Sequence, residues 1–139
     1  LSSDQLNLAN GIWTKVAFNT VQYDLGGNFD EVTNYRFTAP VAGLYSIRGK
    51  VDFVNTIANQ QYAAAIYVNG VLVHQHHGHT GSAASEVDVG VYDEMFLQED
   101  DYVELYAQSN SGGDTVDMDS GSTSTYLGVR LITKEGIRQ

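Results

Sequence analysis

Apolar and polar residues alternate along most of this chain, and such alternation is typical of half-buried β-strands. The longest run covers Gly43–Val54, where one parity holds Tyr45, Ile47, Val51 and Phe53. The opposite parity is largely polar or charged. Because successive side chains of a strand point to opposite faces, we predict a long inner strand whose four apolar side chains face the core.

The second half of the chain repeats this alternation in three further stretches. Their apolar positions are Val87, Val89 and Val91, then Val103, Leu105 and Ala107, then Leu127, Val129 and Leu131. No window shows a sustained helical period with a cap. The sequence therefore predicts an all-β fold of about eight to ten strands, arranged as a sandwich or jelly roll.

Two turns are marked by their residue types. Asn69-Gly70 lies between two β-branched runs, and this pair suits a type I′ hairpin because both central residues need positive φ. Pro40 is the only proline and donates no backbone hydrogen bond, so it ends a strand over Tyr35–Ala39 or lies on an edge. Gly43 then lets the backbone turn, and we expect a corner between two strands here.

Length and composition set the domain organisation. With 139 residues and 42% hydrophobic content, the chain is long enough for one domain with its own core. We expect a lead-in arm over residues 1–10, the domain over residues 11–134 and a tail over residues 135–139. The first residue is Leu and not Met, which suggests a mature product or an excised domain.

The charge is strongly acidic, with 17 Asp and Glu against 7 Lys and Arg and a net charge of −10. Nucleic-acid binding needs clustered basic side chains, so this composition argues against it. No apolar run approaches the ~20 residues of a membrane helix, so we expect no membrane insertion. Cysteine is absent, which excludes disulfides and thiolate chemistry.

Four stretches carry a pattern that is more specific than alternation. FTAPVAGLYSI, residues 37–47, contains Phe-x-x-Pro-x-x-Gly-x-Tyr before a long strand, and in this it resembles the C1q globular head family, the C1q/TNF-like jelly rolls. WTKVAFNTVQYD looks like the first strand of that family, LQEDDYVEL like its turn between two late strands, and STYLGVRLI like its closing strand. The match spans residues 12–132 and implies a jelly roll of about ten antiparallel strands in two sheets.

The resemblance also implies a function. Heads of this family are typically homotrimers that bind ligands on the outside or apex, carry no catalytic machinery and work outside the cell, at a cell surface or on a virion. The composition suggests a bacterial or phage member. Three departures are visible: Asp100 replaces the usual glycine of the late turn, Val129 and Ile132 stand where aromatics are common, and no collagen-like stalk is present. The match covers the head only, and the late turn is open to a different shape.

All four histidines fall in the stretch VHQHHGHTG. Imidazole is a common ligand of Zn, Ni, Cu and Fe, and His74 and His76 lie on the same side of a strand. A three-fold axis would multiply this pair into a transition-metal site. The alternative is an exposed polar strand end, and the family places the corresponding strand on the outer sheet, away from the axis.

The acidic loop GGDTVDMDSGS is the second candidate metal site. Asp114, Asp117 and Asp119 offer the hard oxygen ligands that Ca²⁺ prefers, and similar loops bind Ca²⁺ in some C1q-like heads. Ca²⁺ is therefore the one cofactor that we consider for this chain. The pair Asp117 and Asp119 is only half of a calcium-loop motif and lacks the closing Glu. A plain solvated loop is the alternative.

A third group of residues points to self-association. Glu86 and Asp88 share the non-core parity of a strand that faces the trimer axis in the family, where three carboxylates raise one another's pKa values or recruit a cation. The alternative is a pair of edge charges that discourage edge pairing. Tyr126 begins a stretch that is apolar on both faces and needs a partner. Gly90 and Gly128 permit close approach between subunits.

The sequence holds no convincing catalytic constellation. It lacks a Gly-x-Ser-x-Gly elbow, a thiol and a phosphate-cradling loop, so we expect a protein that is not an enzyme. Two functional classes remain, and fold alone does not decide between them. One is a head that recognises an extracellular protein or glycan, and the other is a structural trimerisation knob of a fibre, spike or surface filament. A metal-dependent enzyme ranks third.

Overall fold

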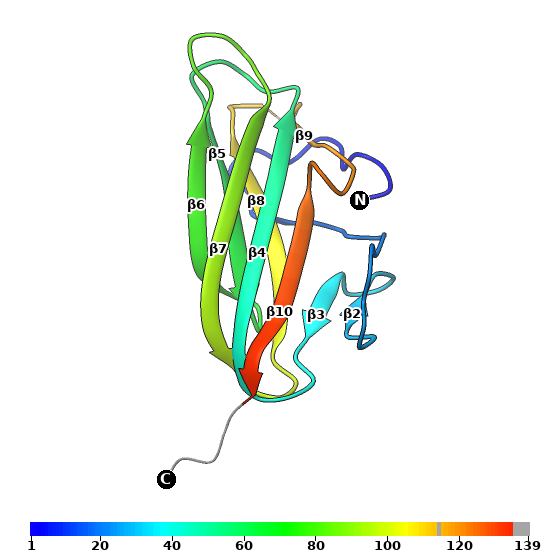
Figure 1. Cartoon of the computed structure of the whole chain (residues 1–139). Coiled ribbons are helices and arrows are strands. Elements are labelled where there is room, and N and C mark those ends of the chain that lie inside the picture. Colours follow the sequence, from blue (N-terminus) through cyan, green and yellow to red (C-terminus); the bar gives the residue numbers. More distant parts are fainter. Residues whose placement is uncertain (114, 135–139) are drawn as a thin grey trace.

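The computed structural model describes residues 1–113 and 115–134, and within these ranges it contains ten β-strands and no helix (Figure 1). Two antiparallel sheets lie face to face. The four-stranded sheet has the order β10 (Tyr126–Lys134), β4 (Gly43–Val54) and β7 (Val87–Leu97), with β9 (Asp117–Met118) also paired to β4. The six-stranded sheet has the order β2 (Phe29–Asp30), β3 (Arg36–Thr38), β8 (Tyr102–Asn110), β5 (Gln61–Val68) and β6 (Val71–His79), with β1 (Thr14–Lys15) also paired to β8. The all-β, two-sheet prediction is confirmed.

The longest strand, β4, has the bounds that its alternation predicts. Its side chains Tyr45, Ile47, Val51 and Phe53 are all buried in the core between the sheets. The Tyr45 hydroxyl donates a 2.7 Å hydrogen bond to the Val41 carbonyl, so its polar atom is satisfied. The predicted inner strand and its orientation are both confirmed.

Gly49, on the same parity of β4, sets how closely the two sheets pack. A Cβ atom at this position would lie 2.4 Å from Cδ1 of Leu105, which belongs to β8 of the other sheet. Protein interiors leave no space for such an overlap. Glycine at this position therefore makes room for the Leu105 side chain.

Both marked turns adopt backbone conformations that are unusual for most residues. Asn69 and Gly70 have φ values of 51° and 78°, which confirms the hairpin between β5 and β6. Asp100 has a φ of 70°, so it takes the left-handed conformation that a glycine would take in the late turn. The Asp101 carboxylate accepts 2.7 Å hydrogen bonds from the backbone N–H of Gln98 and from Nδ2 of Asn69, and thereby ties the two turns together.

Two strands near the N-terminus are shorter than their sequences indicate. β3 lies inside the predicted stretch Tyr35–Ala39, and it cannot begin earlier because Tyr35 has a φ of 50°. Pro40 follows the end of this strand, as predicted. The stretch WTKVAFNTVQYD forms a strand only at β1, although Phe18 is still buried. Beyond Phe18 the chain continues outside both sheets until β2.

The lead-in arm contributes to the core. Leu8 is buried, and its backbone N–H donates a 2.9 Å hydrogen bond to the Val116 carbonyl. Gln5 forms an isolated antiparallel bridge with Met118 of β9. Residues 5–8 therefore hold the segment that precedes β10 against the sandwich.

Candidate functional site

The outer face of the four-stranded sheet carries three exposed aromatic side chains. Cross-strand pairing arranges its residues in rows, which are Tyr126, Lys50 and Gly90, then Gly128, Arg48 and Tyr92, then Arg130, Ser46 and Glu94. Phe96 lies beyond these rows at one end, and Asp52 is paired with Asp88 at the other. Tyr92, Phe96 and Tyr126 are 52%, 47% and 39% exposed. Aromatic residues are enriched at protein interfaces, so these three side chains make this face a candidate contact surface.

Most residues predicted at the subunit interface lie on this face. They are Asp88 and Gly90 of β7 together with Tyr126 and Gly128 of β10, whereas Glu86 precedes β7. A Cβ atom at Gly90 or Gly128 would have no neighbour closer than 4.0 Å. Both glycines therefore leave the sheet flat, so a second surface can approach its backbone closely.

The charges on this face alternate in sign. Nζ of Lys50 lies 3.2 Å from Oδ1 of Asp88. The Tyr92 hydroxyl donates a 2.6 Å hydrogen bond to Oε1 of Glu94, and this bond raises the pKa of Tyr92. Arg48 and Arg130 lie between these acidic groups and are exposed. A surface with interspersed charges of both signs can complement a second copy of itself.

Asp52 is the electrostatically strained residue of this face. Burial, followed by the neighbouring Asp88 carboxylate, raises the pKa of Asp52 from 3.8 to about 6, although Lys50 opposes the rise. Its Oδ1 atom is buried without a hydrogen-bond partner. The Asp52 backbone N–H donates to Thr125 Oγ1 at 3.1 Å, and its carbonyl accepts from the N–H of Asp119 at 2.9 Å. The backbone is thus well anchored while the carboxylate is not.

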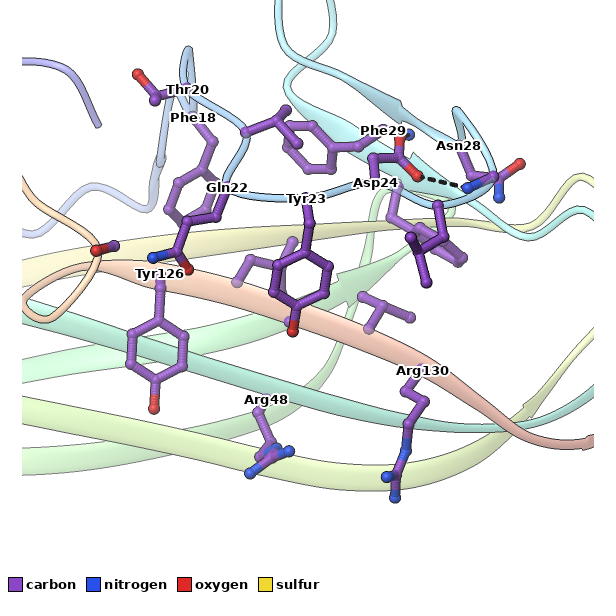
Figure 2. Close-up of a pocket in the computed structure, with 18 of the residues that line it drawn as sticks. Phe18, Thr20, Gln22, Tyr23, Asp24, Asn28, Phe29, Arg48, Tyr126 and Arg130 are labelled. Atoms are coloured by element: carbon purple, nitrogen blue, oxygen red, sulfur yellow. Dashed lines mark hydrogen bonds between the residues drawn. The ribbon is translucent and has the colours of Figure 1, made fainter.

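A crevice of about 750 Å³ runs along the edge of β10 that faces away from β4 (Figure 2). Residues 20–26 form its opposite wall, and Phe18 and Phe29 line its inner side. In Figure 2, Tyr126 and Arg130 project from β10 on the other side, and Tyr23 extends toward β10 from the opposite wall. The sequence does not predict this crevice, because residues 13–24 resemble the first strand of the C1q-like heads, whereas only Thr14–Lys15 among them form a strand.

The outer face of the six-stranded sheet carries a second aromatic group, which the sequence does not reveal. The ring centroids of Tyr67 and Tyr106 are 4.1 Å apart, and Trp13 packs edge-on against Tyr67 at 6.3 Å. Burial raises the pKa values of both tyrosines. Nζ of Lys15 forms an ion pair with the buried carboxylate of Glu104 beside them. The rings of Trp13, Tyr67 and Tyr106 cover one another, so each of them is only partly exposed.

The histidines lie on β6, which is an edge strand. His74 and His76 are paired with Ile66 and Ala64, so they share one side of the strand as expected. Nδ1 of His74 lies 3.7 Å from Oδ2 of Asp93, and His76 is exposed. Within residues 1–113 and 115–134, no three His, Asp or Glu side chains are grouped in a way that could hold a metal ion. The transition-metal site stays a prediction.

Asp117 and Asp119, two of the three candidate calcium ligands, have different surroundings. Asp114 lies outside the described residues. The Asp117 carboxylate is buried and accepts 2.7 Å hydrogen bonds from the Asn7 backbone N–H and from Asn55 Nδ2. Both of its oxygens therefore already hold the lead-in arm and the end of β4 in place. Asp119 is half-buried, and its backbone N–H donates a 2.9 Å hydrogen bond to the carbonyl of Asp52. Calcium binding here also stays a prediction.

Comparisons with known proteins identify the fold. No family model matches the chain. The Bacillus subtilis (strain 168) protein named "Uncharacterized protein YqcC" is 30% identical over 106 residues, which are 73% of this chain and 29% of that relative. The chain thus spans less than a third of the length of this relative. The bacterial or phage origin of the present chain stays a prediction.

Solved structures give a consistent result. The globular domain of zebrafish complement 1qA has a TM-score of 0.63 at 14% identity and covers 96% of both chains. Murine APRIL has a TM-score of 0.63 at 14% identity, with 91% of this chain and 96% of that chain covered. Eiger TNF of S. frugiperda has a TM-score of 0.60 at 7% identity over 99% and 95%. The chain therefore has the C1q/TNF-like jelly-roll fold.

Proposed function

We propose that this chain is a non-enzymatic recognition head that assembles into a homotrimer through the outer face of its four-stranded sheet. The observation that carries this proposal is the unpartnered aromatic surface of Tyr92, Phe96 and Tyr126 on that face. Burial of such side chains dominates the energetics of protein interfaces. We place the head outside the cell, where it binds a protein or glycan ligand.

The fold supports trimeric assembly. C1q and TNF heads, whose fold this chain shares, are non-enzymatic trimeric domains that bind ligands. The flat positions at Gly90 and Gly128 and the interspersed charges around Arg48 suit contact between copies. A trimer also explains why aromatic side chains are placed on a sheet face that residues 1–113 and 115–134 leave uncovered.

A recognition head fits this chain better than a passive knob. A knob needs only the face through which it trimerises, whereas this chain also has a crevice of about 750 Å³ beside β10. Ligand sites are typically concave, with apolar linings and a few polar groups. The crevice has this character, with Phe18 and Phe29 inside and Arg130 at its rim.

The assembly is tested by measuring mass in solution. Analytical ultracentrifugation at micromolar concentration should give three chain masses. Replacing both Tyr92 and Phe96 by Glu should release monomers, because it adds two negative charges to the proposed interface without disturbing the core. Val32→Glu is the matched control, since Val32 is an apolar side chain that is 74% exposed outside this face. A monomeric parent protein, or a trimer that survives the double variant, would contradict the proposal.

A further inference from the structure

β10 is a border strand with an open edge. It pairs with β4 on one side, and among the described residues no strand pairs with its other side. The wall formed by residues 20–26 runs beside this edge, and among the described residues no hydrogen bond joins it to β10. Every second residue of a strand directs its N–H and C=O groups to each edge. This edge therefore presents a row of backbone donors and acceptors to the crevice.

The two sides of the crevice differ in chemistry. Leu127, Val129 and Leu131 of β10 face inward and pack against the core. Phe18 and Phe29 continue this apolar side (Figure 2). On the outward side the same strand carries Tyr126 and Arg130, and Arg48 of β4 lies next to them (Figure 2). The inner side is thus apolar, and the outer side is cationic.

The opposite wall does not fill the space by itself. Val21 is 36% exposed, and Tyr23 and Leu25 are 80% and 98% exposed, so the last two side chains are left largely in water. The Asp24 carboxylate accepts hydrogen bonds from the N–H groups of Phe29 and Gly26 at 2.8 and 3.3 Å. Among the described residues, neither Arg48 nor Arg130 forms an ion pair. Apolar side chains on the wall and cations on the rim both lack a partner of matching chemistry.

We propose that an extended peptide strand, in which apolar side chains alternate with acidic ones, binds in this crevice by adding to the open edge of β10. The backbone of the peptide pairs with β10. Its apolar side chains enter the inner side of the crevice, where they contact Phe18 and Phe29. Its acidic side chains point outward to Arg48 and Arg130. Alternate side chains of one strand point to opposite faces, so a single strand satisfies both sides at once.

The occupant is a segment of another protein. A small apolar ligand would fill the inner side but leave the backbone row and the two arginines unpaired. A second copy of the chain is a weaker candidate, because the proposed trimer contact centres on Tyr92 and Phe96 of β7, which lies on the far side of β4 from this edge. This inference rests on the proposed recognition function and supplies the class of ligand that the head takes.

Synthetic peptides test the proposal. The probe is acetyl-Thr-Val-Glu-Val-Glu-Val-Thr-amide, and the matched control replaces both Glu by Lys. Isothermal titration calorimetry should show binding of the acidic probe at least about tenfold tighter than the basic one, with affinity falling as salt is added. Amide hydrogen exchange followed by NMR should show new protection of alternate β10 amides, and not of the β7 edge, when the acidic probe is present.

Charge reversal sharpens the test. Replacing Arg48 and Arg130 by Glu should invert the preference, so that the lysine peptide binds better. Lys134→Glu is the control, because it makes the same charge change at the end of β10 away from the crevice lining. The melting temperature of each variant shows that it is folded, and its mass in solution shows whether the charge change also alters the proposed trimer, because Arg48 and Arg130 lie on the same face of the sheet.

Three results would overturn the proposal. They are equal binding of both peptides, binding without protection of β10, and occupation of the edge by a second copy, which would appear as protection of β10 that depends on protein concentration without any peptide. The mass of the protein measured in the same samples separates this outcome from a failure of the proposed trimer. A trimer that binds neither peptide defeats the strand-addition site alone.

Discussion

The two outer faces of the sandwich use aromatic residues in opposite ways. On the six-stranded sheet, Tyr67 and Tyr106 stack at 4.1 Å and Trp13 packs against them, while Lys15 neutralises a buried Glu104. On the four-stranded sheet, Tyr92, Phe96 and Tyr126 are 52%, 47% and 39% exposed and, among the described residues, pack against no other ring. The aromatic side chains of the first face cover one another, whereas those of the second do not, and this difference is the reason why we propose a partner for the second face. Aromatic content alone does not distinguish the two faces, but the contacts between the rings do.

The largest loss of stability should come from removing Lys15, the cation on the outer face of the six-stranded sheet. Lys15→Met leaves the Glu104 carboxylate buried without its counter-charge and should lower the free energy of unfolding by about 3 kcal/mol. Lys50→Met is the matched variant on the open face, where Asp88 remains 60% exposed, and should cost less than about 1 kcal/mol. Urea unfolding of both variants measures the difference. Equal losses would mean that the two faces are equally closed.

A smaller change in stability should follow from pH, through Asp52 on the outer face of the four-stranded sheet. The pKa of Asp52 is raised to about 6 in the folded chain from an ordinary value of 3.8, so ionising this group costs stability. The cost is absent at pH values below about 4, grows as pH rises and is complete above about pH 6. Asp52→Asn removes the charge in the same shape and should raise the melting temperature by a few degrees at pH 7 and by nothing at pH 4.

Thermal melts of the parent and the variant across this pH range provide the measurement. Asp30→Asn is a useful contrast, because backbone N–H groups of Thr33 and Val32 lower the pKa of Asp30 to about 2. That variant should be less stable than the parent at pH 7, which is the opposite sign. A pH-independent difference between Asp52→Asn and the parent would contradict the assigned pKa.

The smallest effect concerns calcium at the end of the open face. If Asp119 and its neighbours hold Ca²⁺, added Ca²⁺ should raise the melting temperature and chelator should lower it, by mass action. Asp119→Asn should abolish this response. Asp117→Ala is unsuitable as the sole test, because it also removes the hydrogen bonds to Asn7 and Asn55 and should destabilise the protein without any metal. A melt that ignores Ca²⁺, with no metal in elemental analysis, would retire the calcium site.

The sequence by itself determined the features that depend on neighbouring residues. The alternation in Gly43–Val54 predicts both the strand and its buried side, because the period of two is a local property of an extended backbone. Asn69-Gly70 predicts its hairpin, since positive φ is a preference of those two residues. The late turn shows the limit of this reasoning. Asp100 adopts the left-handed conformation that is expected for the glycine usual at this position, but Asp by itself has no requirement for it.

Only the tertiary structure decided which surfaces are covered. Asp117 looks like a calcium ligand in the sequence, yet its oxygens bind Asn7 and Asn55, which are distant along the chain. Residues 13–24 resemble a complete strand in the sequence, yet only Thr14–Lys15 form one, and residues 20–24 line a crevice beside β10 without pairing to it. Likewise Tyr92 and Tyr106 each occupy an outward position of a long strand, but only Tyr106 finds a ring to pack against. Partners of this kind come from segments far apart in the sequence, so local periodicity cannot specify them.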